Sequence, residues 1–187
     1  INSLEIEIDN AIVDLLALQQ PVAIDLRLIL AAAKINNDLE RIGDHAVNIA
    51  ESALAFCERR PEEPLLDLPK MAELTQKMLR DALDSFIHND PQMGKTVLTV
   101  DDQVDGLNKD MAHEVAGLVR KDASLIEGGL QVLRVSRNLE RVADLATNIA
   151  EEVIFITEAR IVKHHAFEEG PPSTKPAGGR RSTEAER

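Results

Sequence analysis

Large aromatic side chains are almost absent from this sequence. It contains no Trp and no Tyr, and aromatic residues make up 2% of its 187 residues. The core must therefore consist of aliphatic side chains and Met, and the many Glu, Lys, Arg and Gln residues beside them favour helices over strands. Since 44% of the residues are hydrophobic, the composition predicts an all-α protein with one compact domain or two small repeats.

Cysteine, positive charge and long apolar runs are also scarce. A single cysteine, Cys57, cannot form an internal disulfide, so we expect a reducing, cytoplasmic compartment. The net charge of −12 disfavours binding to nucleic acid or to anionic lipid. No apolar run approaches the roughly 20 residues of a membrane span. No signal peptide is visible, and the start at Ile1 indicates a fragment whose upstream sequence is open.

Helical periodicity runs along most of the chain, and prolines interrupt it. It predicts five helices, at residues 1–19, 22–59, 69–88, 91–120 and 125–162. Ser124 is the expected N-cap of the last helix, because Glu127 completes a capping-box spacing. The chain is thus predicted to comprise a first repeat with two helices (1–60), a linker (61–68), a second repeat with three helices (69–163) and a disordered polar tail (164–187).

Two segments 100 residues apart are nearly the same. Residues 37–51 read NDLERIGDHAVNIAE and residues 137–151 read RNLERVADLATNIAE, with nine identities in fifteen positions and no gap. The repeated Glu, Arg, Asp and Asn lie mostly off the apolar face, where packing demands little. A duplicated surface pattern indicates a duplicated function, with residual similarity after gene duplication as the alternative. The apolar face expected in helix 22–59 consists of Leu28, Ala31, Ile35, Leu39, Ile42, Ala46, Ile49 and Ala53.

Each repeated segment carries two carboxylates four residues apart, and a second such pair precedes it on the neighbouring helix. Side chains at this spacing are neighbours on a helix, where two like charges repel each other. A cation between them would remove the repulsion. Folding the fourth helix onto the fifth about their turn sets Asp101 near Asp144 and Asp105 near Glu140. The candidate metal ligands are Glu5, Asp9, Glu40, Asp44, Asp101, Asp105, Glu140 and Asp144.

The first half supports the same cluster less directly. Folding about Gln20-Pro21 sets Glu5 nearest residue 36, about one helical turn short of Glu40. Oxygen ligands suit hard cations such as Mg, Ca, Mn and ferric iron. The Glu-x-x-His motif of di-iron bundles and the Cys/His spacings of structural zinc sites are missing. His45 is interpreted as a surface residue and Cys57 as a packing residue.

Residues 19–51, QQPVAIDLRLILAAAKINNDLERIGDHAVNIAE, resemble the first-repeat signature of the PhoU family, including its Q-P-x-A-x-D-L-R start and its E-R-I-G-D core. Residues 138–151, NLERVADLATNIAE, resemble the second signature, with Val142-Ala143 where Ile-Gly is common. The family's acidic pattern, Glu or Asp followed four residues later by Asp, matches all four acidic pairs. The resemblance covers about residues 1–162.

This resemblance implies two pseudo-symmetric three-helix bundles, the first without its N-terminal helix in this sequence. It implies multinuclear metal clusters on the acidic helix faces, with iron the first choice and Mn, Mg, Ca or Zn as other ions. It also implies a negative regulator of phosphate uptake and phosphate-starvation signalling, acting between a phosphate ABC transporter and a membrane sensor histidine kinase, often as a homodimer. By the logic of the repeat, the first bundle exposes an apolar seam that includes Leu15, Leu18 and Leu28, which invites a partner or self-association.

Three other functions stay open. The chain could be the cytoplasmic PhoU-like domain of a sodium–phosphate cotransporter, which the upstream sequence would reveal. It could be a carboxylate-bridged metalloenzyme, although the missing His ligands weigh against this. A plain helical scaffold with solvated acidic faces would bind no metal. Because the sequence lacks G-x-S-x-G and G-x-x-x-x-G-K-[ST] motifs, we expect a protein that is not an enzyme.

Overall fold

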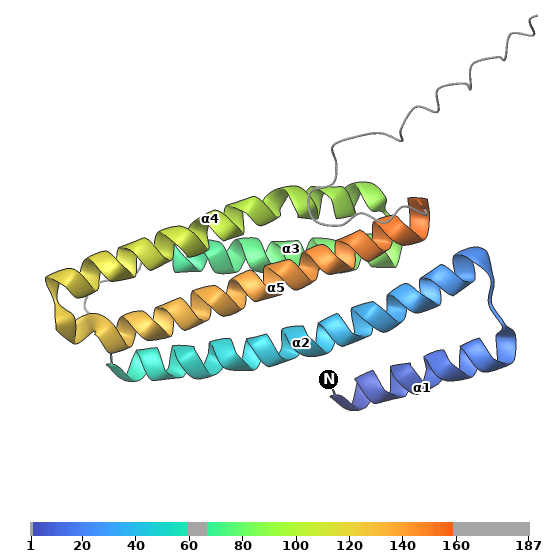
Figure 1. The fold of residues 1–187 in the computed structure, drawn as a ribbon, viewed down its shortest axis with the longest axis horizontal. Coiled ribbons are helices and arrows are strands. Elements are labelled where there is room, and N and C mark those ends of the chain that lie inside the picture. Colours follow the sequence, from blue (N-terminus) through green and yellow to red (C-terminus); the bar gives the residue numbers. More distant parts are fainter. Residues whose placement is uncertain (1, 60–66, 159–187) are drawn as a thin grey trace, which may run out of the picture.

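The computed structural model describes residues 2–59 and 67–158, which form an all-α fold without strands (Figure 1). The elements are α1 (Asn2–Gln19), α2 (Ala23–Arg59), α3 (Leu68–His88), α4 (Pro91–Lys121), the short 3₁₀ helix η1 (Ala123–Leu125) and α5 (Ile126–Glu158). All five predicted helices are present, and their described ends lie within one residue of the predicted ones. The predicted end of the last helix at 162, most of the linker and the tail 164–187 lie outside the described residues.

The turns around α4 are built from side chains that cap helix ends. Asp90 is the N-cap of α4, and its carboxylate accepts hydrogen bonds from the backbone N–H groups of Gln92 and Met93 at 2.9 and 3.2 Å. At the other end, Asp122 accepts from the N–H of Ser124 at 2.9 Å. The prediction of Ser124 as N-cap was therefore wrong, because Asp122 takes this role two residues earlier and η1 precedes α5.

Helix α5 is the centre of the molecule. It packs against α2, α3 and α4, whereas α1 packs against α2 only. Helices α3, α4 and α5 form one three-helix bundle, and α1 and α2 form the hairpin of the other half (Figure 1). Side chains from both halves, including Ile35 and Ile42 of α2 and Met71 and Met78 of α3, contribute to one continuous core against α5.

The two repeated helices, α2 and α5, differ in how much of the same face is covered. Ala146 and Ala150 of α5 are fully buried beneath α3 and α4, whereas their counterparts Ala46 and Ala50 of α2 are exposed. The predicted apolar face of α2 is thus only partly core: Ala31, Ile35 and Ile42 are buried, Leu39 and Ile49 are half-buried, and Leu28, Ala46 and Ala53 are exposed. Nothing in the described residues covers the rest of that face.

The predicted apolar seam is confirmed on the hairpin of α1 and α2. Leu15 and Leu28 are 45% and 40% exposed, and Leu18 is 76% exposed. No residue of α1 is buried. Cys57 is exposed as well, so its interpretation as a packing residue was wrong. None of the helices that the structure describes combines the length and the apolar character needed to span a bilayer.

Candidate metal centre

The hairpin of α4 and α5 brings three carboxylates together. Ligand oxygens of Asp105, Glu140 and Asp144 all lie within 4.8 Å of one another, and all three side chains are half-buried. Asp105 comes from α4, and the other two residues come from adjacent turns of α5. The predicted approach of Asp105 to Glu140 therefore holds. Asp101 lies one turn earlier on α4 and is half-buried, but it is not part of this group.

One hydrogen bond made by a buried serine marks the register of this hairpin. Ser136 is fully buried on α5, and its hydroxyl donates to Asn108 Oδ1 on α4 at 2.7 Å. Asn108 lies three residues after Asp105, and Ser136 lies four residues before Glu140. Because the two helices are antiparallel, this bond places the two carboxylates opposite each other one turn further along.

Glu140 lies in an environment that disfavours its negative charge. Burial raises the pKa of its carboxyl group above the ordinary value, and the neighbouring charges of Asp144 and Asp105 raise it further. Two arginines act in the opposite direction: Arg137 lies 2.8 Å from Oε1, and Arg141 Nε lies 3.9 Å from Oε2. Glu140 Oε2 is buried and accepts no hydrogen bond.

These features fit a cation. A metal ion among the three carboxylates would satisfy the buried oxygen of Glu140 and offset the repulsion within the group. The donor set consists of oxygen atoms alone, the ligands that hard ions prefer. The role of these residues as metal ligands stays a prediction, and so does that of Asp101.

In the first half, the four predicted carboxylates are not brought together in this way. Asn36, the repeat counterpart of Ser136, is buried, and its amide donates to the Glu5 carbonyl and to Asp9 Oδ1, both at 3.0 Å. Glu5 thus faces residue 36, one turn short of Glu40, as the sequence predicted. In the part of the chain that the structure describes, Asp105, Glu140 and Asp144 form the only group of three acidic, His or Cys side chains close enough to share an ion.

The register explains this difference between the halves. Asn36 and Ser136 are equivalent positions, and their partners are Glu5 and Asp9 in the first half but Asn108 in the second. By their place in the hairpin, Glu5 and Asp9 are therefore equivalent to residues around Asn108. They are not equivalent to Asp101 and Asp105, the acidic pair that precedes Asn108. Their spacing of four residues matched the acidic pattern, but it could not reveal this shift of about one turn. The assignment of Glu5, Asp9, Glu40 and Asp44 as metal ligands stays a prediction.

Comparison with known proteins identifies the relatives of this fold. The family model described as PhoU domain matches residues 1–53 and 68–153, which contain both copies of the repeat. The chain belongs to the PhoU family. It is 39% identical over 169 residues to the phosphate-specific transport system accessory protein PhoU homolog of Aquifex aeolicus, covering 90% of this chain and 76% of that protein. The corresponding protein of Pseudomonas aeruginosa is 37% identical, with coverages of 88% and 68%.

Solved structures of PhoU proteins agree with the fold. The crystal structure of PhoU from Pseudomonas aeruginosa superposes with a TM-score of 0.82 at 36% identity, covering 85% of this chain and 77% of that one. The phosphate transport system regulatory protein PhoU from Streptococcus pneumoniae gives a TM-score of 0.77 at 30% identity, with coverages of 87% and 76%. The resemblance to the PhoU family that the sequence motifs indicated is therefore confirmed.

Sequence reasoning missed the polar contact between the two PhoU repeats. His45 of α2 was interpreted as a surface residue, but it is half-buried, and its Nδ1 lies 2.9 Å from Asn138 Oδ1 of α5. The helix wheel placed His45 about 100° away from the acidic face. From that position on α2 the His45 side chain reaches α5. A helical wheel of α2 alone does not show where α5 lies, so it could not predict this contact.

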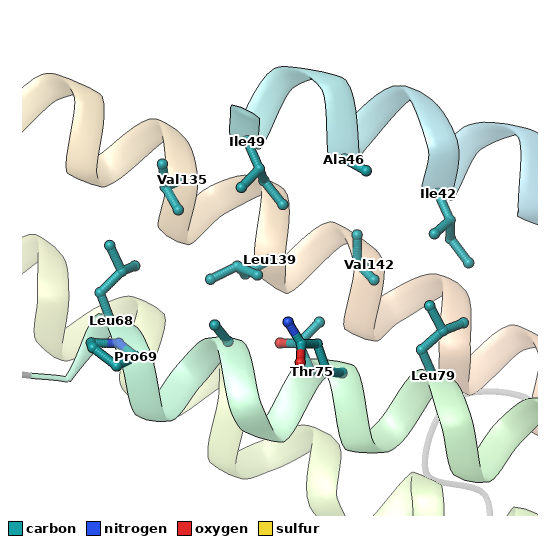
Figure 2. A pocket seen from close by; sticks show the side chains of 12 residues that line it. Ile42, Ala46, Ile49, Leu68, Pro69, Thr75, Leu79, Val135, Leu139 and Val142 are labelled. Carbon is teal, nitrogen blue, oxygen red and sulfur yellow. The ribbon is translucent and has the colours of Figure 1, made fainter. Parts of the chain in front are cut away.

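An apolar groove lies between α2 and α3, with α5 as its floor (Figure 2). Its volume is about 490 Å³. Helix α2 contributes Ile42, Ala46 and Ile49, and α5 contributes Val135, Leu139 and Val142. The groove exists because α2 and α3 both pack on α5 without contacting each other. Thr75 of α3 lines it and is 1% exposed, and its hydroxyl has no hydrogen-bond partner.

Proposed function

We propose that this PhoU-family chain is a non-catalytic regulator of phosphate uptake. Its relatives in Aquifex aeolicus and Pseudomonas aeruginosa are named accessory proteins of the phosphate-specific transport system, and the chain spans 76% and 68% of their lengths. The finer proposal is that it acts in the cytoplasm as a negative modulator of the phosphate ABC transporter and of phosphate-starvation signalling through a membrane sensor histidine kinase. Its surface is acidic, with a net charge of −12, which suits protein partners better than nucleic acid.

The proposal includes a metal centre on the duplicated acidic helices. The observation that carries it is the convergence of Asp105, Glu140 and Asp144, with a buried Glu140 oxygen that accepts no hydrogen bond. Iron in a multinuclear cluster is our first choice, and Mn, Mg, Ca or Zn are the other ions. When bound, the metal would neutralise the carboxylates and tie α4 to α5. Metal loading would thereby fix the shape of the surface that these two helices present to a partner.

We also propose that the protein forms a homodimer. The support is the apolar seam on α1 and α2, where Leu15, Leu18 and Leu28 are exposed to solvent. Sedimentation velocity at micromolar concentration tests this part of the proposal. A dimer is the expected result, and a monomer over the whole concentration range would contradict it.

The regulatory role is tested in a bacterium whose own PhoU protein has been deleted and whose phosphate-starvation response drives a phosphatase reporter. Expression of the complete protein is expected to lower the reporter signal in phosphate-rich medium. The double variant Asp44→Asn, Asp144→Asn is expected to fail. A matched control, Asp110→Asn with Glu114→Gln, removes two exposed carboxylates of α4 that lie outside the group and is expected to act like the wild type. An unchanged reporter with wild-type protein present at normal levels would contradict the regulatory role.

A further inference from the structure

Helices α2 and α5 lie side by side and antiparallel (Figure 1). Each residue of α2 has its repeat counterpart 100 positions later on α5, so a contact between the two helices has an equivalent place elsewhere along them, where the counterparts of the same residues meet. We call these two equivalent places the first and the second junction. In the first junction, Lys34 of α2 lies against α5. Its Nζ is 2.6 Å from Glu152 Oε1 and 5.7 Å from the centre of the Phe155 ring. Asp38, one turn along α2, is buried, and this burial raises the pKa of its carboxyl group. The nearby charge of Glu152 raises that pKa as well, which shows that Asp38 faces the same glutamate. The first junction thus brings together a lysine, two carboxylates and an aromatic ring.

The second junction holds the repeat counterparts of these residues. Arg134 stands where the first junction has Lys34, and Asn138 stands where it has Asp38. On the opposite helix, Ser52 replaces Glu152 and Ala55 replaces Phe155. The result is a cavity of about 350 Å³ between α2 and α5, lined by all four of these residues. Two large side chains are thus replaced by two small ones, and the cavity occupies the place where they would lie.

The electrostatics of the second junction also differ. Both acids that face the lysine in the first junction are replaced by neutral groups in the second, whereas the cation is retained. No carboxylate of the described residues forms an ion pair with Arg134. Ser52 is buried, at 7% exposure, and Asn48 and Gln131 add two amides to the lining. The lining of the cavity therefore combines the Arg134 cation with several neutral hydrogen-bond donors, and Glu51 is its one carboxylate.

We propose that this cavity binds a small oxyanion, which takes the place that the Glu152 carboxylate occupies in the first junction. Arg134 supplies the charge, since a guanidinium group matches carboxylate and phosphate oxygens with two parallel N–H donors. The Ser52 hydroxyl and the amides of Asn48 and Gln131 supply further donors. The anion comes from one of two sources: the carboxylate of an organic acid or an inorganic oxyanion such as phosphate.

One residue of the lining favours the first source. Glu51 also lines the cavity and is exposed, and its negative charge repels a doubly charged anion more than a singly charged one. The missing counterpart of the Phe155 ring leaves room for an apolar group beside the carboxylate. An aromatic or branched carboxylate would fill both vacated positions. This site uses none of the eight predicted metal ligands, so the result of its test is independent of the proposed regulatory function.

The test uses titrations of the full chain, labelled with ¹⁵N, with sodium benzoate and separately with sodium phosphate at constant ionic strength. Saturable shifts of the Arg134 side-chain Nε–H signal and of the Ser52 amide signal are expected. Arg134→Gln is expected to weaken binding at least about tenfold, as loss of a charge-assisted pair does. Lys34→Gln, the equivalent change at the first junction, is the matched control and is expected to bind like the wild type.

A second variant rebuilds the first junction inside the second. Ser52→Glu with Ala55→Phe supplies the missing carboxylate and ring from the chain itself, so the shifts with either anion are expected to disappear while circular dichroism stays unchanged. Saturable shifts with benzoate alone assign the site to organic acids, and shifts with phosphate assign it to inorganic oxyanions. Two results would overturn the proposal: no saturable shift with either anion, or undiminished binding by Arg134→Gln.

Discussion

The close approach of α4 and α5 at Gly129 gives the sharpest prediction about the hairpin that forms the candidate metal centre. An Ala Cβ at this position would lie 2.7 Å from Val115 Cγ1, about 1 Å closer than a normal carbon–carbon contact. Val115 is 5% exposed, so its methyl group has little room to move. Overpacking of this kind costs about 1–3 kcal/mol, and the better helix propensity of Ala returns about 1 kcal/mol. Gly129→Ala should therefore lower the free energy of unfolding by about 1 kcal/mol.

Gly117→Ala is the matched control on α4, because nothing lies within 4 Å of an added Cβ there. This variant gains helix propensity without a clash, so its free energy of unfolding should rise by up to about 1 kcal/mol. The two variants should thus differ by about 2 kcal/mol, or roughly 4–8 °C in Tm for a chain of this size. Urea denaturation followed by circular dichroism at 222 nm measures the difference. Equal stability of the two variants, or a more stable Gly129→Ala, would refute the close packing on which the register of Asp105 and Glu140 depends.

Two further predictions concern buried polar groups. Thr75→Val replaces a fully buried hydroxyl that has no partner, so it should raise the free energy of unfolding by about 1 kcal/mol. Urea denaturation measures it, and a loss of stability would show that the hydroxyl is satisfied. In chelator-treated protein, burial and Asp144 raise the pKa of Glu140, so its charged form destabilises the fold. At neutral pH, Glu140→Gln should therefore have a higher free energy of unfolding than the wild type. This difference should shrink as the pH falls from the raised pKa of Glu140 in the folded protein to the ordinary pKa of a glutamate. A difference that is independent of pH would contradict this environment.

The helices could be predicted because the information that defines them is local. Apolar periodicity and prolines placed every described helix end within one residue. The approach of Asp105 to Glu140 followed from the length of one hairpin, because a tight turn between two straight helices fixes which residues face each other. The convergence of Asp144 with these two residues followed from its position one turn beyond Glu140 on the same helix.

The remaining features depend on contacts that no single helix specifies. The exposure of Ala46 and the burial of its counterpart Ala146 cannot be read from their closely similar local sequences. They differ because α3 and α4 cover α5, whereas no described helix covers that part of α2. The cavity beside Arg134 shows the same limit. Its residues come from both repeats, and only the packing of α2 on α5 places them together.

The arrangement of carboxylates in the second half could not be transferred to the first half for a similar reason. The acidic pattern at Glu5 and Asp9 looked equivalent to that at Asp101 and Asp105. The hydrogen bonds of Asn36 instead place Glu5 and Asp9 about one turn away from that position. A spacing of four residues recurs at every turn of a helix, so it identifies a face but leaves the position along the helix undetermined.

The most direct test of the account is the metal content of the protein, measured by plasma mass spectrometry after purification without chelator or metal-affinity resin. The wild type is compared with Asp44→Asn, Asp144→Asn and with the control Asp110→Asn, Glu114→Gln. The account predicts at least one equivalent of iron or manganese per chain in the wild type and the control, and a loss of metal in the first double variant. Wild-type protein without bound metal, or equal metal content in all three proteins, would contradict it.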